Sequence, residues 1–388
     1  MQHLQYQRGF GNIHWSQAIA GVLPEGHNSP QTVKFGLYPE QISGSSFTAQ
    51  RSENWRTWVY RILPTVALTQ KGMVLDNEIY HWGKSAEAGK TIAINPERWF
   101  PPKFSPLLFP SALVTNVVNG TPEAGYGAQI GWYHLKEGPS SRALCNTDGE
   151  MLFLPQEGAV LVETELGRLW VPERHLVVIP RGILFRLSSP RPARGYFCEN
   201  YGAPFRLPSL GLIGSNGLAN PQDFFVPTAW YAADGDENSP VATLVTKSQG
   251  AFFEAPFVHS PWNVVAWHGN YTPYLYPLER FQVLGSISFD HPDPSLFTVL
   301  TSPSLAPGYA NLDLVLFSRR WLVALDTFRP PYFHRNRMSE WMGLLEGTYD
   351  AKEEGFVPLG ASLHNAMNIA KSSLVLQMLQ CSPLLLLS

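Results

Sequence analysis

The sequence predicts a mainly β protein with a jelly-roll β-sandwich architecture in two domains. The chain of 388 residues contains 33 Pro and 32 Gly, and both residue types interrupt helices. Residues 145–201 divide into short apolar runs with a turn signal between successive runs, a spacing typical of sandwiches and jelly rolls. The length is also sufficient for two domains, each with its own core.

The composition excludes several classes of protein. Apolar residues make up 44% and charged residues 15% of the chain, which indicates a folded globular protein. The net charge of -3 and the pI near 6.4 provide no electrostatic footprint for nucleic acid or an anionic membrane. We expect no signal peptide, because the N-terminus lacks an apolar run, and the final SPLLLLS is too short to span a bilayer. Three cysteines without a metal-ligand spacing favour a reducing compartment, so we predict a cytoplasmic protein without nucleic-acid or membrane partners.

The first sixty residues are rich in Gly, Asn, Ser and aromatic residues and show no periodicity. This pattern predicts an extended segment that lies on the body of the fold and is held by aromatic anchors, namely Phe10, Trp15, Phe35 and Phe47. The run WVYRIL then predicts a strand. Prolines throughout residues 99–110 predict an irregular, stiffened segment.

The most regular part of the N-terminal half is the series MLFLP, AVLVET, RLWVP, HLVVIP and LFRLS. Gly158 and Gly167, followed by VVIPRGILF, are similar to the strand and turn order of a cupin barrel. A metal-binding cupin would carry a histidine after Pro180-Arg181-Gly182, where this chain has Leu184 and Phe185. We therefore expect a cupin-like N-terminal domain that binds no metal.

Other residues in this half have ordinary structural explanations. We interpret His175 as a turn residue before a strand and His268 as a buried histidine with satisfied hydrogen bonds. The glycines at 211, 214 and 217 are too loosely spaced for a dinucleotide-binding loop, and Pro221 blocks the helix that should follow.

The stretch 330–364 contains the clearest chemical pattern. Two prolines at its start disfavour a helix, and in a strand His334, Asn336, Met338 and Glu340 would share one face. An imidazole and a carboxylate on one face could supply two thirds of the 2-His-1-carboxylate triad that holds Fe(II) with open positions. The alternative is a surface pair on an edge strand.

The spacing His334-x-Asn336-x3-Glu340-x6-Gly347 resembles the first cupin motif, with asparagine in place of one histidine. Residues 358–360, PLG, followed by His364, resemble the second cupin motif, in which a further histidine comes from a neighbouring strand. In this chain His364 falls one place late.

The resemblance extends over nearly the whole chain and points to the homogentisate 1,2-dioxygenases. It is weakest between residues 66 and 131 and fails after Met367. The segments that carry it are YQRGFGN, LPEGHNSPQ, FGLYPEQISGSSFT, WVYRI, IGSNGLANPQDF, NVVAWHGNYTPY, FDHPDPSLFTVLT, PPYFHRNRMSEWMG, YDAK and GFVPLGASLHN.

The resemblance implies opening of the homogentisate ring by O2 at Fe(II), giving maleylacetoacetate in tyrosine and phenylalanine breakdown. It implies His334 and Glu340 as iron ligands, His291 as the base, and Tyr349 and His364 as substrate contacts. An N-terminal domain of residues 1–279, a C-terminal cupin domain of residues 280–388 and a homo-oligomer built as a trimer-based hexamer are also implied.

His291 has support of its own, because it lies in FDHPDPS between two aspartates. A carboxylate beside an imidazole can fix its tautomer and raise its pKa, as suits a base that works near neutral pH.

The end of the chain departs from the family. The family's third iron-binding histidine lies six residues beyond the position of His364, and this chain has Ala370 there. Residues 365–388 contain a single charged residue, Lys371. We interpret this tail, altered after residue 367, as the result of a frameshift, a retained intron or a misjoined exon. Two protein ligands hold iron less securely than three. His364 could supply the missing ligand if it turned toward the metal, because the general cupin motif assigns a ligand on the second strand to this histidine.

Three hypotheses follow. The first is an active iron dioxygenase. The second is a catalytically impaired subunit that still joins the family's oligomer, and Ala370 favours it. The third is a cupin used for binding or storage without redox chemistry, for which the HRN-x3-E spacing and FDHPDPS would have no purpose.

Overall fold

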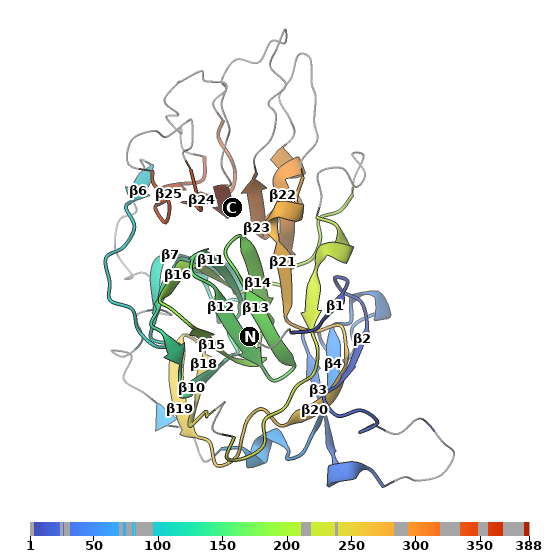
Figure 1. Ribbon diagram of the computed structural model, residues 1–388. Helices are drawn as coiled ribbons and strands as arrows, with labels where there is room; N and C mark the ends of the chain where they lie inside the picture. The colour runs from blue at the N-terminus through green and yellow to red at the C-terminus, as the bar shows by residue number, and fades with distance from the viewer. Residues whose placement is uncertain are drawn as a thin grey trace.

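The computed structural model describes residues 4–23, 26, 32–69, 73–74, 80, 82, 96–210, 219–236, 240–282, 294–318, 334–347, 356–367 and 384–387. Within these ranges the chain forms strands and short 3-10 turns, arranged in four sheets (Figure 1). The mainly β architecture predicted from the sequence is therefore confirmed. No helix in the described part is long and apolar enough to cross a membrane.

Two sheets form the N-terminal body. The first has eight strands in the order β1 (Tyr6–Arg8), β17 (Phe225–Pro227), β21 (Tyr274–Pro277), β14 (His175–Ile179), β11 (Glu150–Glu157), β16 (Ala193–Asn200), β8 (Tyr126–Leu135) and β7 (Leu113–Thr121). The second follows the order β13 (Gly167–Val171), β12 (Val160–Thr164), β15 (Leu184–Ser189), β10 (Arg142–Asn146), β18 (Thr243–Ser248), β19 (Ala251–Pro256) and β5 (Met73–Val74), with β9 (Gly138–Pro139) paired to β15.

The core of this body lies between the two sheets. Phe153 on β11 and Phe185 on β15 are buried, and their ring centroids lie 6.1 Å apart. The apolar runs of the sequence become β11 to β15, each ended by a turn. Burying such side chains stabilises the fold by roughly 25 cal/mol per Å² of apolar surface.

A third sheet has four strands in the order β2 (His14–Gln17), β20 (Val264–Gly269), β4 (Arg56–Arg61) and β3 (Tyr38–Ser43). The predicted anchoring of the N-terminal segment is correct for Phe10, whose ring packs edge-on against Phe224 and Tyr274 at 5.0 Å. It is wrong for Phe35 and Phe47, which are 42% and 76% exposed, whereas Trp15 is 60% exposed but stacks on the His268 ring. Backbone pairing of β1 with β17 and of β2 with β20 holds the segment instead.

The two ordinary histidines differ in environment. His175 begins β14 and is directed to the backbone oxygen of Glu173, as a turn residue would be. His268 is half-buried, not buried as predicted, and its ring stacks on the exposed Trp15 ring with the centroids 4.3 Å apart. Its ring nitrogen lies 3.1 Å from the Tyr60 hydroxyl.

The fourth sheet belongs to the C-terminal part of the chain. Its order is β22 (Thr298–Pro303), β23 (Ala310–Phe317), β26 (Leu384–Leu387), β24 (Glu340–Leu344), β25 (Ala361–His364) and β6 (Glu97–Trp99). Two of these strands come from distant segments. The final apolar run forms β26 between β23 and β24, and β6 reaches across from the N-terminal half to pair with β25 (Figure 1).

One face of β24 packs on the N-terminal body. The indole nitrogen of Trp341 donates to Asn116 Oδ1 at 2.8 Å, and its ring meets Tyr196 edge-on. The Tyr196 hydroxyl donates toward the carbonyl oxygens of Leu344 at 3.0 Å and Gly360 at 2.8 Å. A Cβ at Gly343 would lie 2.9 Å from the Tyr196 ring, so only glycine allows this close approach.

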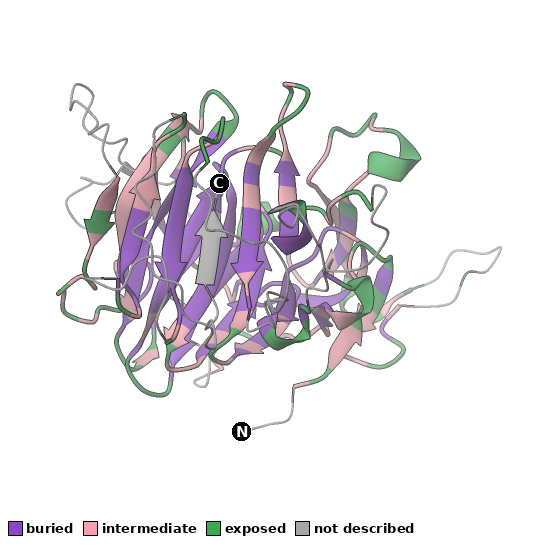
Figure 2. Cartoon of the chain, turned by 90° about the horizontal axis from the view of Figure 1, so that it is seen from above, coloured by how far each residue is buried: buried purple, intermediate pink, exposed green. Residues whose placement is uncertain are grey.

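The other face of β24 faces a separate apolar cluster, which contains Phe297, Val315, Met342, Leu344 and Phe356. Neighbouring residues of a strand point to opposite faces. Glu340 therefore lies on the same face as Met342 and Leu344, away from the N-terminal body. Figure 2 shows buried residues along the strands of the molecule and exposed residues mainly in the loops between them.

Candidate active site

The candidate site lies where the chain enters β24. Strand β24 begins at Glu340, and residues 334–339 form a loop before it. The prediction that His334, Asn336, Met338 and Glu340 share a single strand is therefore wrong. The reason is local: the Asn336 side chain accepts a hydrogen bond from the Met338 amide at 3.2 Å, a turn that competes with extended pairing.

The predicted partners nevertheless meet. His334 Nε2 lies 3.0 Å from Glu340 Oε1, and Asn336 Nδ2 donates to the same oxygen at 3.1 Å. The Glu340 residue is 9% exposed, whereas half of the His334 side chain is exposed. The loop thus folds back over the start of the strand, and a buried carboxylate receives two polar side chains from it.

His364 reaches the same carboxylate from the neighbouring strand. Glu340 and His364 are directly opposite in the antiparallel ladder of β24 and β25. His364 Nδ1 lies 3.8 Å from Glu340 Oε2, and only 16% of its side chain is exposed. His334 and His364 therefore approach different oxygens of one carboxylate.

Backbone contacts fix this arrangement. The Met367 amide donates to the Asn336 carbonyl at 2.7 Å, and the Ala366 amide donates to Ser339 Oγ at 3.1 Å. After β24, Gly347 has a φ of 76°, in the left-handed region that glycine adopts without strain. The turn that follows β24 thus explains why the sequence motif has a glycine at position 347.

His334 and Glu340 shift each other's pKa in the direction that favours the charged form of each. The hydrogen bond to Glu340 raises the pKa of His334 above its usual value, in opposition to the effect of burial. Burial acts to raise the pKa of Glu340, but the hydrogen bond and charge of His334, with contributions from Asn336 and His364, hold that pKa below its usual value. Glu340 is therefore a carboxylate at neutral pH, the form that binds a metal.

The spacing of the two groups suits adjacent metal ligands. Two donor atoms about 2.1 Å from an octahedral metal and at right angles to each other are about 3 Å apart. The observed separation of His334 Nε2 and Glu340 Oε1 is 3.0 Å. Within the described ranges, no three His, Cys, Asp or Glu side chains form a metal-binding group.

The other site residues named from the sequence are His291, Tyr349 and Ala370. All three lie outside the described residues. Their roles therefore stay predictions.

The sequence reasoning missed β6, which extends the site sheet on the far side of β25. Its residues Glu97 to Trp99 precede a proline-rich segment, and three residues give too short a pattern to predict a strand.

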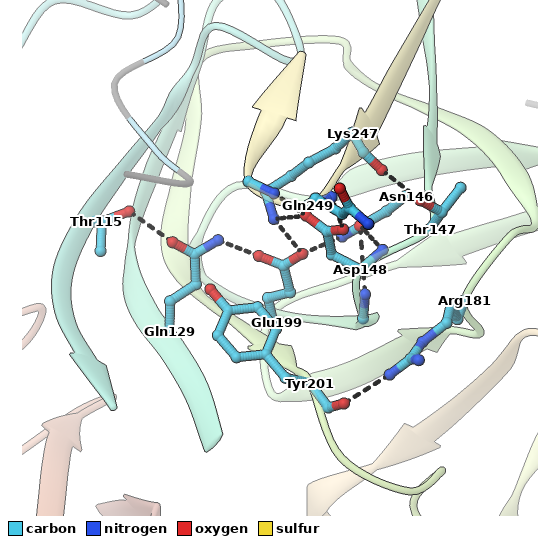
Figure 3. Close-up of polar contacts among 12 residues, drawn as sticks. Thr115, Gln129, Asn146, Thr147, Asp148, Arg181, Glu199, Tyr201, Lys247 and Gln249 are labelled. Atoms are coloured by element: carbon cyan, nitrogen blue, oxygen red, sulfur yellow. Dashed lines mark hydrogen bonds and ion pairs between the residues drawn. The ribbon is translucent and has the colours of Figure 1, made fainter. Parts of the chain in front are cut away.

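The N-terminal body contains a polar cluster of its own (Figure 3). Lys247 Nζ lies 2.6 Å from Asp148 Oδ2 and 2.9 Å from Glu199 Oε1, and all three side chains are at most 4% exposed. Asn146 Nδ2 and Gln129 Nε2 also donate to Glu199. An ammonium group of the chain itself thus occupies the space between the two buried carboxylates.

The fold and site together define a class: a mainly β protein in which a buried carboxylate at the start of one strand meets an imidazole from the preceding loop and faces another imidazole on the neighbouring strand. Comparison with known families is more specific. The homogentisate 1,2-dioxygenase N-terminal family matches residues 5–278, and the homogentisate 1,2-dioxygenase C-terminal family matches residues 279–373. The chain belongs to the homogentisate 1,2-dioxygenase family, a family of ring-cleaving dioxygenases.

Three of the solved structures that resemble the chain do so distantly. The chain is similar to the protein Ylba from E. coli, with 9% identity over 78% of this chain and 93% of that one and a TM-score of 0.30. It is also similar to a putative glyoxylate-induced protein from Pseudomonas aeruginosa, with 8% identity over 79% and 93% and a TM-score of 0.34. A cupin 2 conserved barrel domain protein from Leptotrichia buccalis gives 7% identity over 71% and 86% and a TM-score of 0.29.

Proposed function

We propose that this chain holds Fe(II) through His334 and Glu340 and uses it to open the ring of homogentisate with O2. The supporting observation is the 3.0 Å contact between the imidazole and the buried carboxylate. An imidazole with a carboxylate is the donor set of the facial triad. Bound iron would supply adjacent positions for the aromatic diol and for O2, and both oxygen atoms would enter maleylacetoacetate.

The chain's own residues would orient the reactants and move the proton. His291 would accept the proton of a substrate hydroxyl, and Tyr349 and His364 would contact the substrate. The apolar cluster beside β24, which includes Met342 and Phe356, would limit the access of water to Glu340. A less hydrated site strengthens each charge interaction within it.

Two roles for His364 fit its place opposite Glu340, and they predict different results. As a substrate contact, it would change the affinity for homogentisate and leave iron binding intact. As a replacement for the family's third ligand, whose position is Ala370, it would change iron binding itself. The second role requires a modest rotation, since Nδ1 is 3.8 Å from Glu340 Oε2.

Iron content separates these assignments. We would reconstitute the wild type and the variants Glu340→Gln, His334→Ala and His364→Ala anaerobically with Fe(II), and determine bound iron after gel filtration. Glu340→Gln and His334→Ala should lose most of the iron. His259→Ala is the matched control, because His259 is an exposed histidine that pairs with Asp234 on the surface. Equal iron in the wild type, Glu340→Gln and His334→Ala would contradict the proposed ligands.

A second candidate function is that of a catalytically impaired subunit. Alanine at position 370 favours it, because it removes one ligand of the family's site. Such a chain would assemble into the proposed trimer-based hexamer without taking up O2. Light scattering after gel filtration measures the assembly, and a monomer would contradict the proposed hexamer.

A cytoplasmic location is also part of the proposal, in agreement with the free thiols of Cys145 and Cys198.

A further inference from the structure

A small cavity of about 20 Å³ lies in the N-terminal body, where the segment of residues 6–12 packs on strands β17 and β21. The carboxyl group of Glu150, at the start of β11, lines this cavity. Most of its other walls are aromatic, namely Phe10, Trp55, Phe205, Tyr271 and Tyr274. A cavity of this size holds about one water molecule, so it cannot hydrate an ionised carboxylate as bulk water does.

Described residues donate hydrogen bonds to only one of the two carboxyl oxygens of Glu150. Asn200 Nδ2 and the Phe205 amide both donate to Oε1, at 2.9 and 2.6 Å. Tyr274 lines the same cavity, but its buried hydroxyl has no hydrogen-bond partner among the described residues. Because Glu150 is only 4% exposed, a negative charge on it would be poorly solvated.

The one nearby cation compensates this charge only in part. The Arg181 guanidinium, on the turn before β15, lowers the pKa of Glu150, but burial has the larger effect and raises that pKa to about 7. Arg181 donates instead to the carbonyl oxygens of Tyr201 and Gly202, at 2.7 and 3.2 Å. The guanidinium is therefore held away from the carboxyl group.

The remaining neighbours of Glu150 carry no charge near neutral pH. Tyr271, Tyr274 on β21 and Cys198 on β16 are the titratable groups that its charge affects, and burial together with the nearby carboxylates raises the pKa of each. Strand β17 and the N-terminal segment face the cavity with Val226 and with residues 10–11, which cannot ionise. An ionised Glu150 thus has no full counter-ion in the closed cavity.

The N-terminal segment is the wall of the cavity that can move most easily. Its strand β1 has three residues and pairs only with β17, at the edge of the first sheet. Strands β11, β17 and β21 are each paired on both sides. Phe10 is half-buried, and its ring packs edge-on against Trp55 at 6.1 Å and against Phe224 and Tyr274 at 5.0 Å. Displacement of this ring would open the cavity to water.

We propose that Glu150 and the N-terminal segment form a pH-sensitive clasp, in which Phe10 closes the cavity while the Glu150 carboxyl group is protonated and moves away when it ionises. Opening admits water and returns the pKa of Glu150 toward its ordinary value of 4.5. The closed form therefore binds the proton more tightly, and its advantage is fully present below pH 4.5 and is lost as the pH rises to about 7. With these two pKa values, the ratio of open to closed chains rises about tenfold between pH 6 and pH 8.

The test is hydrogen exchange of the full chain, followed by mass spectrometry at pH 6, 7 and 8, in the wild type and Glu150→Gln. Glutamine keeps the volume of the side chain and cannot ionise. The ratio of the two rates at each pH removes the intrinsic effect of pH on exchange. For the amides of residues 6–12, the rate in the wild type relative to Glu150→Gln should rise about tenfold from pH 6 to pH 8, at exchange times when β11 and β16 are still protected.

Glu157→Gln is the matched control, because Glu157 is an exposed carboxylate on the same strand that pairs with Arg194. Its rates relative to the wild type should not depend on pH. Phe10→Ala removes the ring that closes the cavity. Exchange of the segment should then be faster than in the wild type, and the two rates should converge as the pH rises.

A ratio of the wild type to Glu150→Gln that stays constant from pH 6 to pH 8 would overturn the proposal. An equal rise in β18 and β19, in the other sheet, would also overturn it, because the whole domain would then loosen with the segment. If Glu150→Gln does not fold, the comparison with Phe10→Ala decides, and a rate difference that is the same at every pH would overturn the clasp.

Discussion

Replacement of Lys247 by methionine should destabilise the protein strongly. Its ammonium lies 2.6 Å from Asp148 and 2.9 Å from Glu199, and it faces the rings of Trp82 and Tyr201 at 5.6 and 5.5 Å. Methionine retains much of the side chain's volume but leaves two buried carboxylates without their cation. Removal of one partner of a buried ion pair costs about 3–5 kcal/mol, and this lysine serves two partners.

The assay is urea unfolding followed by tryptophan fluorescence, with the free energy of unfolding taken from the first transition. Lys247→Met should lose about 3–5 kcal/mol, whereas Arg194→Met at the surface should change by less than about 0.5 kcal/mol. Adding Glu199→Gln to Lys247→Met should restore part of the loss, because one uncompensated charge is removed. A loss below about 1 kcal/mol, or a double variant as unstable as the sum of both single variants, would refute the argument that Lys247 is the counter-ion of this cluster.

Three further predictions concern stability. Burial raises the pKa of Glu150 to about 7 from 4.5, against the effect of hydrogen bonds from Asn200 and Phe205. The unfolded chain then ionises before the folded one, so stability falls as the pH rises from 4.5 to about 7. Glu150→Gln should therefore become more stable than the wild type as the pH rises through this window, with a difference of about 3 kcal/mol at pH values above it. Thermal unfolding of both proteins at several pH values tests this, and a stability difference that does not change with pH would contradict the reasoning. Tyr196→Phe should cost about 0.5–1.5 kcal/mol, because it removes the hydroxyl that donates to the buried carbonyl oxygens of Leu344 and Gly360, each of which keeps a backbone donor; a change within error in denaturant titration would contradict this. Deletion of residues 384–388 should open a gap between β23 and β24 and increase hydrogen exchange in both strands, and unchanged exchange would show that β26 does not support them.

The sequence predicted well those features that depend on local pattern. The runs between 145 and 201 became β11 to β15 because each alternates or is continuously apolar and ends at a turn residue. The spacing of His334 and Glu340 correctly suggested that these side chains meet. The structural reason differed, since a turn at Asn336, not a shared strand, brings them together.

Features that depend on distant partners could not be predicted. Strands β6 and β26 are short and acquire their structure from pairing with β25, β23 and β24. Lys247, in the run TLVTKS, has the pattern of a surface lysine, and its burial follows from Asp148 and Glu199 far away in the sequence.

The most direct test of the proposed function is oxygen uptake with homogentisate, on protein reconstituted anaerobically with Fe(II), with bound iron determined on the same sample. We predict stoichiometric iron and rapid uptake, both of which should be lost in Glu340→Gln. Negligible iron and no uptake from wild-type protein that is otherwise folded would contradict the proposal and would indicate a dioxygenase fold disabled by the loss of its third ligand at Ala370.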